Sequence, residues 1–410
     1  MTSRLYYEDA YRHSFTAQVI ETTVHNQHPA VILDQTYFYP TGGGQPHDTG
    51  MMIPERTTRE GTSRILNVIE VMARPSDGAI LHVLDGALDE EPVQCTINWG
   101  RRFDFMQQHT GQHILSQAFN QTCGASTIGF HLGGEVVTID IDKANLTRED
   151  IEATEALANR IIFDNRAVST RFTSREESEG IRARRIPGSV ADDALRVVTI
   201  EDFDMTACGG THVARTGEIG MILVLTTERY KGGFRITFVC GGRAFHAARS
   251  RISMVNVLAA EMSCAINELP ASVSRLREQV GNAEKTMKAM RERLADFEGA
   301  ALADSAELHG TVRIAIAAYD IRDASELRLL AARITQEPRT MAILGSAGDK
   351  ALIICARSAD LDTDMNSVLR RILEPLGGRG GGHPALAQGG VVGITREQLL
   401  EALQSAARTL

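Results

Sequence analysis

The chain has 410 residues, of which 43% are hydrophobic and 23% are charged, and its formal net charge is −9. This length predicts two to four domains, and the composition is that of a globular protein, which excludes wholesale disorder. The longest apolar runs, such as Met221–Leu225, fall far below the ~18 residues that cross a bilayer, and the N-terminal stretch lacks a signal-peptide pattern. We therefore expect a cytoplasmic protein. Its net charge disfavours indiscriminate nucleic-acid binding but permits a local basic strip.

Residues 1–98 alternate short apolar runs with turn residues, which is typical of a small antiparallel β-domain, either a barrel or a sandwich. One connection follows the aromatic-rich run Tyr37–Tyr39 and contains three consecutive glycines, which let a backbone approach a ligand closely with its amides available. An ordinary hairpin turn would need fewer glycines. The candidate ligand-binding residues of this loop are Thr41, Gly42, Gly43, Gly44 and Gln45.

Residues 99–242 change to a mixed pattern that predicts an α+β domain. The pattern begins with a helix from Arg101 that carries His109 and His113, and the i to i+4 spacing places both imidazoles on one helical face. About a hundred residues later, Cys208 and His212 flank a glycine-softened turn. Three imidazoles and a thiolate form a borderline-soft donor set that suits Zn²⁺, although the two pairs could also be unconnected.

Two further features of this domain narrow its chemistry. A zinc protease would carry glutamate after the first histidine, where Thr110 stands, so we do not expect peptidase activity. Four protein ligands also close a tetrahedral shell, which leaves open whether an ion would serve substrate or architecture. His131 lies in a glycine-flanked turn, where a structural role and a substrate-binding role are both open.

Residues 243–305 predict two helices, one over 244–264 and a second that begins near Ala271. The second helix has an apolar a/d seam over about four heptads, within residues 273–301. Such a seam needs a partner. The partner is either the same helix of another chain, which would make a homodimer, or the preceding helix folded back as a hairpin.

Residues 306–410 alternate strands with helices and predict a small α/β domain. Its segment 377–390 is rich in glycine but lacks the lysine of a phosphate-binding loop, so a flexible linker is the alternative to a functional motif. Basic residues near it could contact phosphates, as could Arg182, Arg184 and Arg185. The candidate contacts in this domain are Arg370, Arg371, Arg379, Gly380, Gly381 and Gly382.

The motifs FYPTGGGQPHDTG, DFMQQHTGQHILSQAF, CGGTHV and GGRGGGHPALAQGG, together with LYYEDAY, resemble the long AlaX-type alanyl-tRNA editing proteins, which are related to the editing and C-terminal domains of alanyl-tRNA synthetase. The resemblance implies a deacylase that removes serine or glycine from mischarged alanine tRNA and carries one Zn²⁺ per chain. His109, His113, Cys208 and His212 would be the zinc ligands, and Gly42–Gln45 the active-site loop. No adenylation domain precedes these motifs, so we expect editing in trans.

The resemblance also names the four segments of an α+β multidomain protein. They are an N-terminal β-barrel-like domain at 1–98, a zinc-binding editing domain at 99–242, a helical connector at 243–305 and a tRNA-binding α/β domain at 306–410. Loop amides could stabilise an oxyanion, and a site that hydrogen-bonds the seryl hydroxyl would reject alanine. We expect Thr41 or Gln45 to bind that hydroxyl, and His131 is the next candidate.

Two other functions remain open at this point. One is a non-catalytic zinc-containing tRNA-binding protein, and the other is editing of a different ester, such as a threonyl-type substrate. A comparison of hydrolysis rates for several aminoacyl esters separates them.

Overall fold

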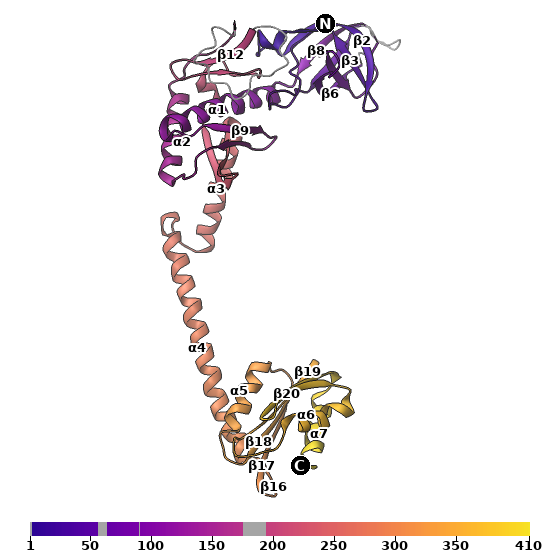
Figure 1. The fold of residues 1–410 in the computed structure, drawn as a ribbon, viewed down its shortest axis with the longest axis vertical. Helices are drawn as coiled ribbons and strands as arrows, with labels where there is room; N and C mark the ends of the chain where they lie inside the picture. The colour runs from indigo at the N-terminus through magenta and orange to yellow at the C-terminus, as the bar shows by residue number, and fades with distance from the viewer. Residues whose placement is uncertain (1, 56–63, 90, 175–193) are drawn as a thin grey trace. The chain divides into compact units, whose positions relative to one another are not determined.

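The computed structural model describes residues 2–55, 64–89, 91–174 and 194–410. The chain forms two compact units, Met1–Val257 and Leu258–Leu410, and each is described by itself (Figure 1). Arg182, Arg184 and Arg185 lie outside the described residues.

The first unit begins with a closed barrel, which confirms the predicted N-terminal β-domain. The barrel strands follow one another in the order β2-β3-β7-β6-β5-β8. Alternate residues of β2 point inward, among them Phe15, Ala17 and Val19, as expected of strands with one buried face. The strands are β2 (Ser14–His25), β3 (His28–Leu33), β5 (Gly50–Pro54), β6 (Leu66–Ala73), β7 (Ile80–Leu84) and β8 (Pro92–Ile97). Two short strands outside the barrel, β1 (Ser3–Arg4) and β4 (Gln35–Thr36), pair in parallel.

Helix α1 (Trp99–Cys123) leaves the barrel directly after β8. The Asn98 side chain accepts a hydrogen bond from Arg101 N at its start, and Gly124 ends it in a left-handed conformation with φ 67°. Arg102 forms a buried ion pair with Asp48 and donates to Tyr37 O at 2.6 Å. Since Tyr37 and Asp48 bracket the glycine-rich loop, this contact fixes the loop against α1.

Two sheets complete the first unit. One has the strand order β14-β15-β10-β9, and the other has the order β11-β12-β13. Residues of α1 and α2 (Arg148–Phe163) share a core with the first sheet, including Phe105, Ile114 and Ile162. The strands are β9 (Thr127–Leu132), β10 (Val137–Ile141), β11 (Val168–Ser174), β12 (Ala194–Ile200), β13 (Asp204–Ala207), β14 (Ile222–Tyr230) and β15 (Gly233–Cys240).

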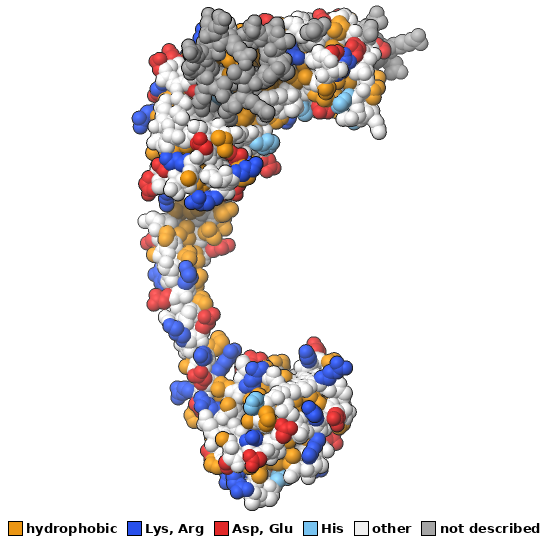
Figure 2. Space-filling view, viewed as in Figure 1, with side chains coloured by type: hydrophobic (Ala, Val, Ile, Leu, Met, Phe, Trp, Pro, Cys, Tyr) orange, Lys and Arg blue, Asp and Glu red, His pale blue; other side chains and the backbone are white. Residues whose placement is uncertain are grey.

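The two helices predicted within residues 243–305 are present as α3 (Gly241–Glu261) and α4 (Leu269–Asp304). Toward its C-terminus, α4 buries Ala295, Gly299 and Ala303, and Ala303 shares a core with α5 (Ala324–Ile334). The a/d seam lies elsewhere on the helix. Its large apolar residues are 47% to 72% exposed, and they are Val273, Leu276, Val280, Met287, Met290, Leu294 and Phe297. Hydrophobic side chains along the helix are visible in Figure 2.

The second unit contains the predicted α/β domain. Its sheet has the strand order β16-β17-β18-β19-β21-β20, in which β17 and β18 run parallel. Alternate strand residues face opposite cores, so that Ala342 and Leu344 pack with α4 and α5 while Met341 and Ile343 pack with α6 and α7. The elements are β16 (Glu307–His309), β17 (Val312–Tyr319), β18 (Thr340–Ser346), β19 (Gly348–Arg357), α6 (Met365–Leu373), β20 (Arg379–His383), β21 (Leu386–Ile394) and α7 (Arg396–Ala407).

The glycine-rich segment is part of this sheet. β20 pairs with β21 in antiparallel register, with Gly380 opposite Gly389. The flexible-linker alternative is therefore wrong, because the glycines form two paired strands. None of the described helices combines the length and apolar composition that a membrane span requires.

Candidate metal and deacylation site

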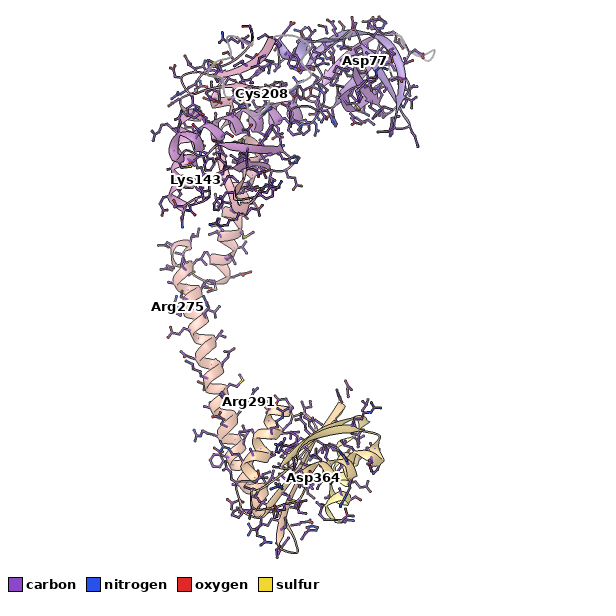
Figure 3. All side chains as sticks on the ribbon, in the orientation of Figure 1. Asp77, Lys143, Cys208, Arg275, Arg291 and Asp364 are labelled. Carbon is purple, nitrogen blue, oxygen red and sulfur yellow. The ribbon has the colours of Figure 1, made fainter. Side chains whose placement is uncertain are left out.

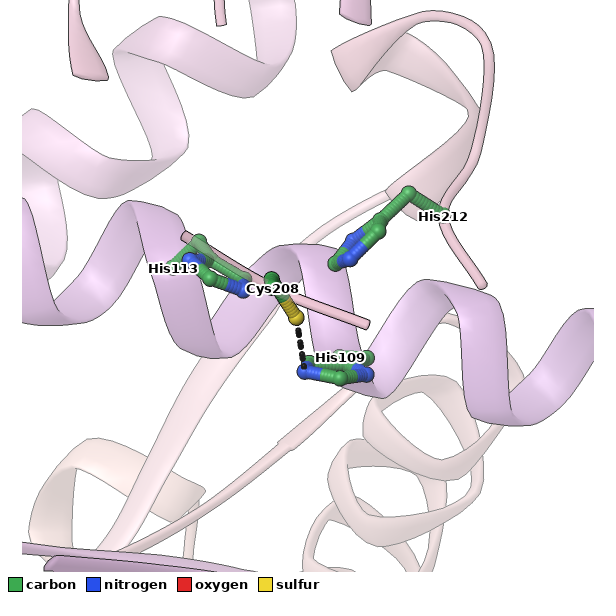
Figure 4. Close-up of side chains that lie close together, drawn as sticks. All are labelled: His109, His113, Cys208 and His212. Carbon is green, nitrogen blue, oxygen red and sulfur yellow. Dashed lines mark hydrogen bonds between the residues drawn. The ribbon is translucent and has the colours of Figure 1, made fainter. Parts of the chain in front are cut away.

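His109, His113, Cys208 and His212 come together in the first unit (Figure 4). Helix α1 provides the first two residues one turn apart, and the loop after β13 provides the other two. One ligand atom from each residue lies within 4.8 Å of the other three. The Cys208 Sγ is 3.3 Å from His109 Nε2, and Figure 3 places Cys208 beside α1. The two motifs are therefore one cluster, which could bind a metal ion.

Hydrogen bonds orient two of the three imidazoles for such binding. His109 Nδ1 lies 2.9 Å from Gln45 Oε1, and since an amide oxygen only accepts, Nδ1 donates and Nε2 is left as the metal ligand. His212 Nδ1 is 3.1 Å from Thr110 Oγ1. The buried His212 Nε2 has no hydrogen-bond partner among the described residues. A metal ion would satisfy that nitrogen, so the donor set fits Zn²⁺.

The charge state of His212 agrees with this role. Burial, followed by the nearby His109 and His113, holds the pKa of His212 well below its usual range. A neutral imidazole offers a lone pair to a metal, whereas a protonated one cannot.

Glycines let the backbone approach the quartet closely. A Cβ on Gly210 would lie 2.2 Å from His109 Cε1, so the loop that contains Cys208 can pass this close only without a side chain. Gly44 has φ 85°, and a Cβ there would lie 2.5 Å from the Phe130 ring. The Phe130 ring centroid is 5.6 Å from that of His109. The glycine-rich loop is thus brought next to the metal quartet through Phe130.

Within the loop, Gln45 is buried and Thr41 is exposed. Gln45 Oε1 also accepts from Thr211 N at 3.0 Å, and its Nε2 donates to Thr211 Oγ1 at 2.8 Å. The Thr41 hydroxyl lies 3.0 Å from His47 Nδ1 and makes none of these contacts. Gln45 therefore connects the barrel loop with both motifs of the quartet.

The turn between Gly42 and Gln45 leaves two backbone amides available. Gly42 N donates to Gln45 O at 3.1 Å, and Gln45 N donates to Gly42 O at 2.9 Å. Among the described residues, the N–H groups of Gly43 and Gly44 have no acceptor. Two adjacent backbone donors without an acceptor are chemically suited to a negatively charged or carbonyl oxygen.

The other predicted site residues are not part of the quartet: His131 belongs to the first unit, and the arginines and glycines of 370–382 belong to the second. His131 is exposed on β9, and strand alternation directs its neighbour Phe130 to His109 instead. Arg370 and Arg371 are in the last turn of α6, and both are exposed. Residues 379–382 are exposed on β20, at the edge of the second unit's sheet.

Sequence reasoning missed the residues that support the quartet. In the sequence, Thr110 was informative only as the residue that replaces the glutamate of a zinc protease. In the structure its hydroxyl accepts a hydrogen bond from Val213 N at 3.2 Å and forms another with His212 Nδ1. Thr211 and Arg196 were not identified. Thr211 lies inside the CGGTH motif, which was a signal, whereas Arg196 had none.

Comparison with known proteins gives a consistent result. Residues 195–237 match the threonyl and alanyl tRNA synthetase second additional domain, and residues 311–409 match the DHHA1 domain. The C-Ala domain of Aquifex aeolicus alanyl-tRNA synthetase is 24% identical, with a TM-score of 0.23, over 25% of this chain and 96% of that structure.

Curated relatives match along nearly the whole chain. Alanine--tRNA ligase of Natronomonas pharaonis is 32% identical over 100% of this chain, which spans 44% of that protein's length. Alanyl-tRNA editing protein AlaX-L of Pyrococcus horikoshii is 29% identical, and the match covers 95% of each protein. The chain is therefore similar, along nearly its whole length, to an AlaX-type alanyl-tRNA editing protein and to a part of the alanyl-tRNA synthetases.

Proposed function

We propose that this protein hydrolyses the aminoacyl ester of alanine tRNA mischarged with serine or glycine, and that it does so in trans. The observation that carries this proposal is the His3Cys quartet, with its three histidines buried, next to a glycine-rich loop with two available amides. The match to AlaX-L over 95% of both proteins supports it. Charged tRNA as the substrate favours action in the cytoplasm.

The proposed cofactor is one Zn²⁺ per chain, held by His109, His113, Cys208 and His212. When bound, the ion supplies a fixed positive charge that holds the loop, and with it the site, in place. Metal analysis of the purified protein should find about one zinc per chain, as the donor count requires. Protein that deacylates without zinc would contradict this assignment.

The hydrolysis needs little beyond positioning and oxyanion stabilisation, because an aminoacyl ester is already labile. The N–H groups of Gly43 and Gly44 are suited to stabilise the developing oxyanion. Gln45 uses three of its four hydrogen-bonding positions within the described residues, which leaves one N–H for the seryl hydroxyl. Thr41 remains the second candidate for that contact, and His131 the third.

The second unit is proposed to bind the tRNA. Arg370 and Arg371 flank the exposed edge strand β20, whose Arg379 and following glycines offer a positive charge and an uncovered backbone to phosphates. We also propose that the exposed seam of α4 pairs two chains, because an apolar heptad stripe of this length is stable in water only when covered.

The test is a deacylation assay with the seryl, glycyl and alanyl esters of one alanine tRNA. We expect rapid hydrolysis of the seryl ester and much slower hydrolysis of the alanyl ester. Binding of the tRNA without hydrolysis would favour a non-catalytic zinc protein. Preference for a seryl ester on threonine tRNA would favour a threonyl-type editor.

A further inference from the structure

Arg196 is a buried cation that contacts the metal-binding loop. It lies on β12, and only 8% of the residue is exposed. Its Nη1 donates to two carbonyl oxygens, Cys208 O at 2.9 Å and Gly210 O at 2.8 Å. One guanidinium nitrogen therefore joins both ends of the segment that contains the thiol ligand.

The backbone of Arg196 holds the same segment. Cys208 N donates to Arg196 O at 3.1 Å, so residue 208 is bonded to Arg196 through both its N–H and its carbonyl. Gly210 N in turn lies 3.4 Å from the Cys208 Sγ. Because two glycines follow the cysteine and have many accessible conformations, these external bonds are what select one loop conformation.

The guanidinium is itself held in place by aromatic rings. The Arg196 Cζ lies 5.2 Å from the centroid of the Tyr7 ring, which is within the range of a cation–π contact. Tyr7 packs edge-on against the buried Tyr6, with ring centroids 4.5 Å apart. Arg196 is thus fixed between a rigid aromatic surface and the loop that it bonds.

We propose that Arg196 is a positioning residue, which holds the Cys208–Gly210 segment so that the thiol points at the three histidines. It acts through the loop and not on the substrate. The inference rests on the proposed function only in that the quartet binds a metal. Loss of residues that orient metal ligands typically lowers metal affinity by roughly 10- to 100-fold, and we expect an effect of this size.

The experiment measures zinc affinity of the full-length protein by competition with a chelator. Arg196→Gln should bind zinc about 10- to 100-fold more weakly than the wild type, and Arg196→Lys should recover part of the loss. The matched control is Arg166→Gln. Arg166 Nη1 also donates to two carbonyls, Glu201 O at 3.3 Å and Asp202 O at 3.0 Å, at the far turn of the same β12–β13 hairpin. This control should leave zinc affinity unchanged.

Cobalt substitution provides a readout that general destabilisation would not move. Co²⁺ bound by a thiolate has a sulfur-to-metal charge-transfer band, which should weaken in Arg196→Gln while cobalt still binds through the histidines. Wild-type zinc affinity and an unchanged band in this variant would overturn the proposal. If Arg196→Gln does not fold, the zinc affinities of Arg196→Lys and Tyr7→Leu test the proposal instead. Wild-type zinc affinity in both variants would overturn the proposal.

The outcome is separable from that of the proposed function. A metal-bound wild type that fails to hydrolyse seryl-tRNA would refute the editing activity and leave the Arg196 result standing. Normal editing together with unaltered metal binding in all Arg196 variants would refute only the positioning role.

Discussion

Gly44 is the residue of the glycine-rich loop at which an added Cβ would collide with Phe130 of β9. Gly44→Ala should lower both stability and deacylation, because the new Cβ would meet the Phe130 ring at 2.5 Å on a backbone with φ 85°. We expect a loss of about 1 to 3 kcal/mol in the free energy of unfolding, measured by denaturant titration.

Two other glycines, Gly43 and Gly134, separate the causes of this loss. In Gly43→Ala the backbone is also left-handed, with φ 56°, but no atom lies close to the new Cβ. In Gly134→Ala there is neither a left-handed backbone nor a close atom. If all three variants behaved alike, the contact between Gly44 and Phe130 would not matter to the site.

The second prediction at the residue scale concerns the side chain that would hydrogen-bond the seryl hydroxyl. Replacing that side chain by an apolar near-isostere removes a hydrogen bond of ~1 kcal/mol and should reduce seryl-ester hydrolysis by roughly fivefold. It also removes the polar group that an alanyl ester would leave unpaired, so discrimination against the alanyl ester should decrease. The structure ranks Gln45→Leu above Thr41→Val, since the Thr41 hydroxyl bonds His47. The ratio of seryl to alanyl hydrolysis on one tRNA measures the effect.

Gln45→Leu also removes the hydrogen bond to His109, so zinc content must be checked alongside. A proportional fall for both esters in Gln45→Leu and Thr41→Val would move the serine contact elsewhere, with His131 next to be tested.

At the scale of elements, the barrel contains a buried titratable group. Burial lowers the pKa of His82 to about 4, and its Nε2 lies 2.9 Å from Thr36 Oγ1. The unfolded chain takes up a proton at His82 below about pH 6.5, while the folded barrel does not. The contribution of His82 to the free energy of unfolding should therefore be fully present above pH 6.5 and decline as the pH falls toward 4.

Thermal unfolding between pH 7 and pH 5 measures this dependence, since most carboxylates stay ionised there. The melting temperature should depend less steeply on pH in His82→Leu than in the wild type. The full contribution of His82 to the free energy of unfolding is up to ~3 kcal/mol. An equal slope in both proteins would show that His82 is not responsible.

The seam of α4 gives a second prediction at this scale. Replacing Leu276 and Met290 together by glutamate should convert a dimer into a monomer, because charges at a/d positions cannot be desolvated in a coiled coil. Sedimentation measures the mass, and Lys285→Glu, outside the a/d positions, is the control. A wild type that sediments as a monomer would instead favour the intramolecular hairpin.

Helices and long strands were predictable from the sequence, whereas short or polar strands were not. The seam helix and α6 follow from their apolar spacing, and the i to i+4 histidines of α1 predicted half of the quartet. β13 has four residues and β20 is mostly glycine, so neither shows a strand pattern. The contacts of Thr110 and Gln45 join residues far apart in the chain, and that of Arg196 depends on pairing with the unpredicted strand β13, so only the folded structure reveals them.

At the scale of the whole molecule, the first unit should fold and bind metal alone. Its two main cores and the whole quartet lie within residues 2–257. A cut near residue 305 would expose the face of α4 that packs on α5, so the fragment 1–257 is the better choice. The fragment should retain zinc and hydrolyse seryl esters with a higher KM.

The same measurement tests the proposed role of the second unit. The fragment should discriminate less between alanine tRNA and other tRNAs that carry serine. Unchanged KM and unchanged tRNA preference would mean that residues 258–410 do not bind the tRNA.

The Gln45 amide lies between the proposed metal site and the loop proposed to bind the ester. Its oxygen fixes the tautomer of His109, and its nitrogen belongs to the loop proposed to receive the ester. If metal binding orders this loop, it strengthens ester binding by a certain free energy. Because such coupling is reciprocal, a bound ester must strengthen metal binding by the same free energy. A non-hydrolysable seryl analogue should therefore slow the escape of zinc to a chelator, and we expect Gln45 to be the side chain that couples the two ligands.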